Sequence, residues 1–221
     1  MKTNQMYEWV TATWNPIRGE CPHRCSYCYV PHSRVKHLYE GEPHLVESAF
    51  KPLGYGKTIF VGSMFDIWAD TIPADWIVRI LEHCRKYDNT YIFQSKNPKR
   101  FQEALQFMPD KVCVGTTIET NRHTHNDNAP CIDNRIEGLY NTQTHPQFIS
   151  IEPIMDFDLW EFIEMIENSH PIFVSIGADS KNHGLVEPSW DKVQALITEL
   201  EKFTEVRMKD NLMRLSPKGG K

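Results

Sequence analysis

Short apolar segments alternate with helical segments through most of the chain after residue 57. The apolar segments, rich in β-branched and aromatic residues, are 57–68, 90–95, 111–118, 147–151, 171–177 and 205–208. The segments between them carry apolar residues at helical spacing and are 73–87, 97–107, 129–141, 157–168 and 188–203. Short strands joined by helices form parallel sheets that are buried on both faces. The alternation therefore predicts an α/β fold.

The connections between parallel strands narrow the choice of architecture. They must be right-handed crossovers, and about six such units fit a barrel, an open partial barrel or a doubly wound sheet. Residues 9–17 are expected to hold the first strand. In all these folds the loops that follow the strands carry the chemistry. Residues at the ends of the predicted strands are therefore the first candidates for a site.

Length and composition favour one globular domain. The 221 residues predict a single domain over 1–215, with a cysteine-containing loop at 18–30 and a disordered tail at 216–221. The net charge of −5 argues against coating nucleic acid by bulk charge, but leaves room for a local basic groove. No apolar run approaches ~18 residues and residues 1–9 do not resemble a secretory signal. We expect a cytoplasmic protein without a membrane partner.

Three cysteines follow the first predicted strand at once. Cys21, Cys25 and Cys28 have C-x3-C-x2-C spacing, which is short enough to wrap one ion or cluster. Three thiolates on a 4Fe-4S cluster leave one iron open for a substrate or cofactor. A structural zinc ion needs four ligands, and His23 is the nearest candidate for the fourth. The spacing favours the cluster, with zinc as the alternative and three buried thiols without metal as a further one.

The remaining cysteines and the histidines show no comparable pattern. Cys84 and Cys113 lie within apolar segments and are expected in the core, whereas Cys131 lies in a polar stretch. His123 and His125 are two residues apart in a polar loop and are expected at the surface. None of these five residues is assigned a role in the site.

The cysteine loop resembles the motif of the radical S-adenosylmethionine (AdoMet) superfamily, C-x3-C-x-aromatic-C. Cys21, Cys25, Tyr27 and Cys28 reproduce it, aromatic residue included. The resemblance implies a partial (βα)6 barrel with parallel strands, and a 4Fe-4S cluster whose open iron is chelated by AdoMet. It also implies reductive cleavage of AdoMet to a 5′-deoxyadenosyl radical, which abstracts a hydrogen atom from a substrate.

A closer resemblance extends over most of the chain. It is to an uncharacterised family common in phages and bacteria that is grouped with the radical AdoMet proteins. The segments that carry it are Trp14-Asn15-Pro16, 115–121, Ser150-Ile151-Glu152-Pro153 and Arg207-Met208-Lys209. This family often has a longer insertion among its cysteines, whereas the spacing here follows the general superfamily motif.

The resemblance assigns expected roles in AdoMet binding to residues at the strand ends. Gly62, Ser63 and Asp66, after the second strand, correspond to the segment that holds the AdoMet amino group. Tyr27 is expected near the adenine. Further cofactor-binding candidates, for the ribose, the adenine and close approach of the adenosyl group, are Thr117, Glu119, Glu152 and Gly177. For each residue the alternative is an ordinary turn, although a carboxylate in the apolar run around Glu152 is costly unless paired.

Two lysines are candidates for orienting the substrate. Lys209 ends the last strand on the open side of the barrel and Lys96 follows the third strand. Either could bind an anion, Lys96 also the AdoMet carboxylate, while the alternatives are a solvated side chain and a basic tail. Family context suggests a nucleotide or nucleic acid substrate and an electron donor of the flavodoxin or ferredoxin type. The competing functions are a zinc-loop binding protein and a cluster protein that does not bind AdoMet.

Overall fold

The computed structural model describes residues 7–122 and 128–217 of the chain. The strands of the main sheet are β1 (Ala12–Trp14), β4 (Thr58–Val61), β5 (Thr90–Gln94), β6 (Val112–Thr117), β7 (Gln147–Ile151), β8 (Phe173–Ile176) and β9 (Glu205–Met208). The α-helices are α1 (Ala74–Cys84), α2 (Ile132–Tyr140), α3 (Leu159–Glu167) and α4 (Trp190–Leu200). His123, His125 and residues 218–221 of the expected tail lie outside the described residues.

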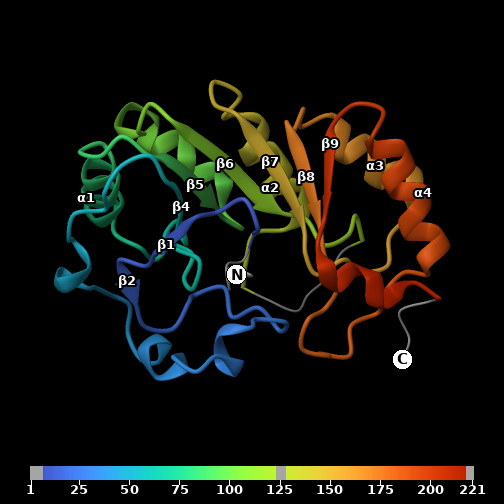
Figure 1. The fold of residues 1–221 in the computed structure, drawn as a ribbon, viewed down its shortest axis with the longest axis horizontal. Helices are drawn as coiled ribbons and strands as arrows, with labels where there is room; N and C mark the ends of the chain where they lie inside the picture. The colour runs from blue at the N-terminus through green and yellow to red at the C-terminus, as the bar shows by residue number, and fades with distance from the viewer. Residues whose placement is uncertain (1–6, 123–127, 218–221) are drawn as a thin grey trace.

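The main sheet is an open, curved, parallel sheet. Its strand order is β1-β4-β5-β6-β7-β8-β9, and every neighbouring pair is parallel. Helices α1 to α4 lie along the convex side, and the two edge strands β1 and β9 do not pair with each other (Figure 1). The predicted α/β fold, a partial (βα)6 barrel that is not closed, is confirmed.

The segment before β4 is more elaborate than the sequence predicted. Pro16, which has no N–H to donate, follows β1 closely and limits it to three residues. A two-stranded antiparallel sheet follows, formed by β2 (Ile17–Arg18) and β3 (His44–Leu45). Around it lie the 3-10 helices η1 (Val30–His32), η2 (Lys36–Tyr39) and η3 (Glu47–Ala49).

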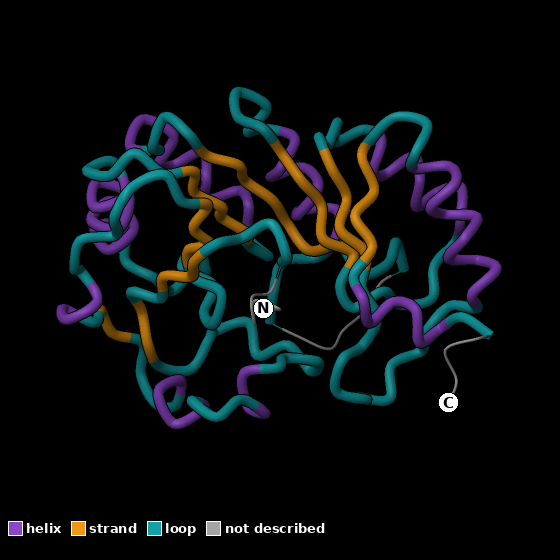
Figure 2. The backbone as a smooth tube through the Cα atoms, in the orientation of Figure 1, coloured by secondary structure: helices purple, strands orange, loops and turns teal. Residues whose placement is uncertain are grey.

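Two further 3-10 helices complete the fold. The segment expected to be helical after Asn97 is the 3-10 helix η4 (Pro98–Phe107), with Pro98 in its first turn, as the N-terminal preference of proline predicts. The other, η5 (Asp210–Leu215), follows β9 directly. Figure 2 shows that the short helices before β4 and η5 gather with the long loops beyond the carboxyl ends of the strands.

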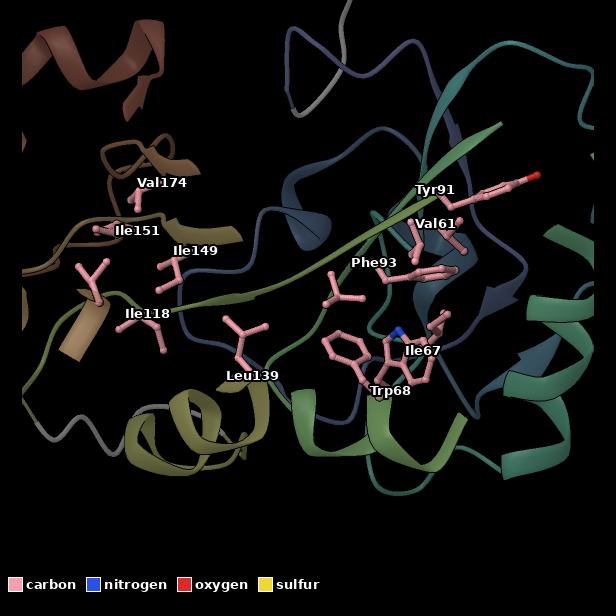
Figure 3. Packing of buried hydrophobic residues seen from close by; sticks show 14 of the residues in the cluster. Val61, Ile67, Trp68, Tyr91, Phe93, Ile118, Leu139, Ile149, Ile151 and Val174 are labelled. Atoms are coloured by element: carbon pink, nitrogen blue, oxygen red, sulfur yellow. The ribbon is translucent and has the colours of Figure 1, made fainter. Parts of the chain in front are cut away.

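The larger hydrophobic core lies between the sheet and its helices. Trp68 is fully buried and packs edge-on against Phe93 and Phe101. Figure 3 shows these apolar side chains meeting between the strands and the helices outside them. Cys84 belongs to this core and Cys113 is buried on the opposite side of the sheet, as expected, while Cys131 is exposed. The helical stripes read from the sequence are the faces that this core buries.

The concave face of the sheet is apolar at one end and polar at the other. A smaller cluster fills the amino-terminal half of this face and contains Phe60, Ile92, Cys113, Phe148 and Phe173. Because side chains alternate between faces every second residue, the next inward positions are Gly62, Gln94, Gly115, Ser150 and Ser175. The chemistry of the concave face therefore changes from apolar to polar toward the carboxyl ends of the strands.

Residues ahead of β1 complete the apolar cluster. Tyr7 and Trp9 stack on each other and pack against the rings of Phe60, Phe148 and Phe173. The Tyr7 hydroxyl donates to the side chain of Gln94 (2.7 Å) and lies 3.0 Å from that of Ser150. This segment therefore forms a floor beneath the polar half of the concave face.

Candidate functional site

A cavity of about 220 Å³ opens where the strands end. Ten of the predicted site residues line it: Cys21, Cys25, Tyr27, Cys28, Gly62, Ser63, Asp66, Lys96, Thr117 and Glu152. The other three, Glu119, Gly177 and Lys209, lie directly behind lining residues that they contact. The structure thus brings together, at one place, residues from seven separate segments of the sequence.

The cysteine loop folds as two consecutive tight turns. The N–H of Arg24 donates to the carbonyl of Cys21 (3.2 Å), and the N–H of Cys28 donates to that of Cys25 (3.0 Å). Arg24 adopts a left-handed conformation with φ of 47°. None of the three cysteines is in a disulfide, and all three are partly buried. The turns direct them toward one cavity, with Tyr29 anchoring the end of the loop by donating to the carbonyl of Ser63.

The thiols of the loop are strongly affected by burial. Burial, followed by the negative charge of Asp66, raises the pKa of Cys21 to about 12, and burial also raises the pKa of Cys28. Thiolates at these positions need a bound cation to compensate their charge. Within residues 7–122 and 128–217, no three His, Cys, Asp or Glu side chains are close enough to ligate a single metal ion. The three cysteines nevertheless all line the same cavity.

Asp66 ties the cysteine loop to the sheet. Its buried carboxylate lies 2.8 Å from Nε2 of His23 and accepts from the hydroxyl of Ser95 (2.9 Å) and the N–H groups of Trp68 and Lys96 (2.9 Å each). Burial alone would raise its pKa, but His23 and the N–H donors hold the pKa of this carboxyl below its usual range. His23, the nearest candidate for a fourth zinc ligand, is therefore already bonded to a carboxylate.

Glu119 is the centre of a buried ionic network. It is 2% exposed and contacts Lys96 from the end of β5 and the Tyr27 hydroxyl from the cysteine loop. Arg135 of α2 donates to its other oxygen at 3.0 Å. Burial alone would raise the pKa of Glu119, yet Lys96 and Arg135 lower it to about 2. The network keeps this carboxylate ionised and links the cysteine loop to β5, β6 and α2.

Arg135 is the member of this network that the sequence analysis missed. It is 3% exposed, and its guanidinium also donates to the carbonyls of Pro130 (2.6 Å) and Thr117 (3.3 Å). The signal was present in the helical pattern, because Arg135 lies three residues after Ile132 and four before Leu139, on the buried stripe of α2. A buried arginine on such a stripe needs a carboxylate partner.

A second ion pair lies on the other side of the cavity. The Lys209 ammonium is 2.5 Å from a Glu152 oxygen and lies over the Tyr7 ring, 4.4 Å from its centre. The N–H of Lys209 donates to the carbonyl of Ile176 (2.9 Å), so the residue continues the β8–β9 pairing and is not part of the tail. Next to this pair stands Gly177, where an added Cβ would lie 3.1 Å from the Glu152 carboxylate.

Hydrogen bonds from the side chain of Asn15 fix the loop after β4. The Asn15 amide pairs with the Ser63 hydroxyl (3.3 Å) and accepts from the N–H of Met64 (3.0 Å). Gly62 has φ of 78°, a conformation that favours glycine and lets the chain turn sharply into the cavity wall. Thr117, at the end of β6, accepts from the side chain of Gln94 (2.8 Å).

Known structures share this open barrel. Spore photoproduct lyase, solved as a cysteine-to-serine mutant, superposes with a TM-score of 0.69 and 12% identity over 95% of this chain and 79% of the other. SuiB of Streptococcus suis, bound to its precursor peptide SuiA, superposes with a TM-score of 0.62 and 10% sequence identity. The match covers 95% of this chain and 51% of SuiB, so the chain spans about half of that protein. Structures of both proteins have been solved with S-adenosylmethionine bound. At this identity the comparison shows that the chain shares their open α/β barrel fold.

The sequence itself places the chain in a family. The sequence profile of the family described as "Protein of unknown function (DUF5131)" matches residues 4–193. The match spans most of the chain, which therefore belongs to this family. A comparison with curated proteins gave no match. Among the described residues, no helix is long and apolar enough to cross a membrane.

Proposed function

We propose that this protein is a radical AdoMet enzyme whose 4Fe-4S cluster is held by Cys21, Cys25 and Cys28. The observation that carries the proposal is that three cysteines, none of them in a disulfide, line one cavity at the carboxyl ends of the strands. Their spacing follows the superfamily motif, and the fold is shared with enzymes of that class. When bound, the cluster supplies the electron that cleaves AdoMet to a 5′-deoxyadenosyl radical.

The donor set suits a cluster better than a single zinc ion. A cluster places its irons apart from one another, so its thiolate ligands need not converge on one point. Zinc needs four ligands about 2.0–2.3 Å from one centre, and His23 is engaged with Asp66. Three thiolates at the wall of an open cavity leave one coordination position for AdoMet.

The remaining side chains of the site are proposed to bind and orient AdoMet. The backbone at Gly62 and Ser63 offers acceptors for its amino group, Glu152 is the candidate for its ribose or adenine, and the absence of a Cβ at Gly177 allows the adenosyl group to approach the sheet. Lys96 offers a charge for the AdoMet carboxylate. The apolar rings around the cavity exclude water and stray hydrogen donors from a radical.

We propose further that the substrate is a nucleotide or nucleic acid. Spore photoproduct lyase, which has the same fold, has been solved with bound AdoMet and dinucleoside spore photoproduct, with a TM-score of 0.67 and 11% identity over 94% of this chain and 78% of the other. Lys209 and Lys96 remain the candidates for orienting an anionic group of that substrate. The electron is proposed to come from a donor of the flavodoxin or ferredoxin type.

Anaerobic reconstitution with iron and sulfide tests the cluster. The wild type is expected to bind about four irons per chain, to absorb broadly near ~400 nm, and to form 5′-deoxyadenosine from AdoMet under dithionite. Replacing Cys21, Cys25 or Cys28 by Ala should abolish all three signals. The matched control is Cys131→Ala, which removes an exposed thiol and should change none of them.

Two results would contradict the proposal. Stoichiometric zinc in anaerobic preparations without iron uptake would identify the loop as a zinc site and favour the binding-protein alternative. Full iron content without any 5′-deoxyadenosine would instead identify a cluster protein that does not cleave AdoMet.

A further inference from the structure

The segment that follows the first cysteine carries cations but no carboxylates. Between Glu20 and Glu40 there is no Asp or Glu, in a chain whose net charge is −5. Arg24 is neutralised by Glu20 at 2.8 Å. Arg34 and Lys36 are exposed and form no ion pair with any residue in the described part of the chain. The local charge of this segment is therefore opposite to that of the whole protein.

This cationic segment forms one side of the cavity rim. Val30 of η1 lines the cavity, and the His32 ring, two residues further on, meets the His183 ring with centres 5.4 Å apart. His183 belongs to the loop between β8 and α4, whose Ser180 lines the opposite wall and whose Lys181 is exposed. Both loops lie beyond the carboxyl ends of the strands (Figure 2). In both loops, exposed cations therefore follow within a few residues of a side chain that lines the cavity.

Other cations at this end of the barrel are already neutralised. Lys209 pairs with Glu152 at 2.5 Å, and Arg214 contacts Glu187 and the carbonyl of Asp179. Their charges are balanced within the protein, so they add little long-range attraction for an approaching polyanion, whereas Lys209 stays a candidate for orienting an anionic group once the substrate is bound. The exposed rim cations, in contrast, keep their full charge toward solvent.

We propose that Arg34, Lys36 and Lys181 bind the phosphate backbone of a single nucleic acid strand and present one nucleotide to the cavity. Exposed lysines and arginines attract phosphates and release counterions. The cavity is assigned above to the cluster and AdoMet, so what reaches it from the surrounding loops is expected to be a single unstacked nucleotide and not a duplex, with Tyr29 and Phe65 as aromatic lining residues. For the chemistry at that nucleotide, the inference rests on the proposed function.

Fluorescence anisotropy with a labelled single-stranded DNA oligonucleotide tests the surface, using the reconstituted protein under anaerobic conditions at several salt concentrations. The double variant Arg34→Gln, Lys36→Gln should bind about tenfold more weakly at low salt. Its slope of log K against log salt should be smaller by about 1.4, or ~0.7 for each lost contact to a single strand. The matched control is Arg85→Gln, Lys86→Gln, which removes two exposed cations after α1, at the opposite end of the sheet.

The outcomes separate this inference from the enzyme assignment. It is overturned if wild type does not bind the oligonucleotide, if both double variants bind equally, or if polyglutamate competes as well as unlabelled oligonucleotide, which would indicate an acidic protein partner. Iron content and 5′-deoxyadenosine are measured on the same samples. If the protein binds the oligonucleotide but holds no iron and forms no 5′-deoxyadenosine, only the proposed function is contradicted. If it holds iron and forms 5′-deoxyadenosine but does not bind the oligonucleotide, only the proposed nucleic acid binding by the exposed cations is contradicted.

Discussion

The buried carboxylate of Glu119 allows a quantitative test of the ionic network. Glu119→Gln keeps the shape of the side chain but leaves Lys96 and Arg135 without their shared negative partner. Removing one member of a buried ion pair costs about 3–5 kcal/mol, because the remaining charge is buried without compensation. We therefore expect a marked loss of stability, although Glu119 lies directly behind the wall of a candidate site.

The pKa of Glu119 gives a second route to the same magnitude. Burial raises it, but Lys96 and Arg135 lower it from 4.5 to about 2. At ~1.4 kcal/mol for each pH unit, folding stabilises the ionised form by about 3 kcal/mol at neutral pH. For a chain of 150–250 residues that corresponds to a melting temperature lower by about 6–12 °C in the variant.

The pH dependence has a definite sign. Because the pKa of Glu119 is lowered by folding, the stabilisation is complete above pH ~4.5 and is lost as the pH falls toward about 2. The difference in unfolding free energy between wild type and Glu119→Gln should therefore be largest at pH 7 and shrink to about half by pH 3. Denaturant unfolding followed by tryptophan fluorescence measures it.

A control and a coupling measurement complete the test. Glu47→Gln removes the carboxylate of an exposed pair with Arg79 and should leave the melting temperature almost unchanged. The double variant of Glu119→Gln with Arg135→Met should be more stable than the sum of the single effects predicts, by about 1 kcal/mol or more. A cost below ~1 kcal/mol at pH 7 for Glu119→Gln, or a difference that stays constant with pH, would refute the reasoning.

Three further predictions concern the sheet and the cavity. Tyr7→Phe removes the hydroxyl's contacts with side chains of β5 and β7 and should lower the free energy of unfolding, measured with denaturant, by about 1–2 kcal/mol. An unchanged denaturation midpoint would contradict the supporting role of Tyr7 beneath the concave face. Gly115→Ala places a Cβ 2.4 Å from the Phe148 ring and should lower the free energy of unfolding by about 1–3 kcal/mol. An unchanged free energy of unfolding would show that the ring moves aside without cost. Gly177→Ala crowds the Glu152 carboxylate and should weaken AdoMet binding to reconstituted protein in calorimetry, with iron content unchanged.

The sequence was most informative where periodicity and position agree. Strands such as 147–151 are short, rich in Ile and Phe and buried on both faces, and helices such as α4 have one apolar stripe, so their order in an α/β sheet could be read directly. That order also fixes where each strand ends, and the strand ends identify Lys96, Glu119 and Glu152 as candidates from the sequence alone. Position along a strand, rather than the identity of each residue, carried this prediction.

Pairing between distant residues could not be read in the same way. Whether Lys96 faces solvent or Glu119 depends on the curvature of the sheet, which no local pattern specifies. The same holds for Tyr7, whose contacts with Gln94 join residues 87 positions apart. The short helices before β4 also escaped prediction, because three or four residues are too few to show a periodic pattern.

The change from apolar to polar side chains along the concave face makes the depth of the cavity adjustable in steps. Inward positions recur every second residue, so each layer of side chains is about 6.6 Å above the one before. Exchanging the layer of Gln94 and Ser150 for larger apolar residues would raise the floor by one such layer, and shortening Phe60 would lower it. None of these positions belongs to the core beneath the helices. Such exchanges would alter the contacts of Tyr7 and the smaller apolar cluster, whereas the larger core between the sheet and its helices would stay the same while the barrel accommodates substrates of different size.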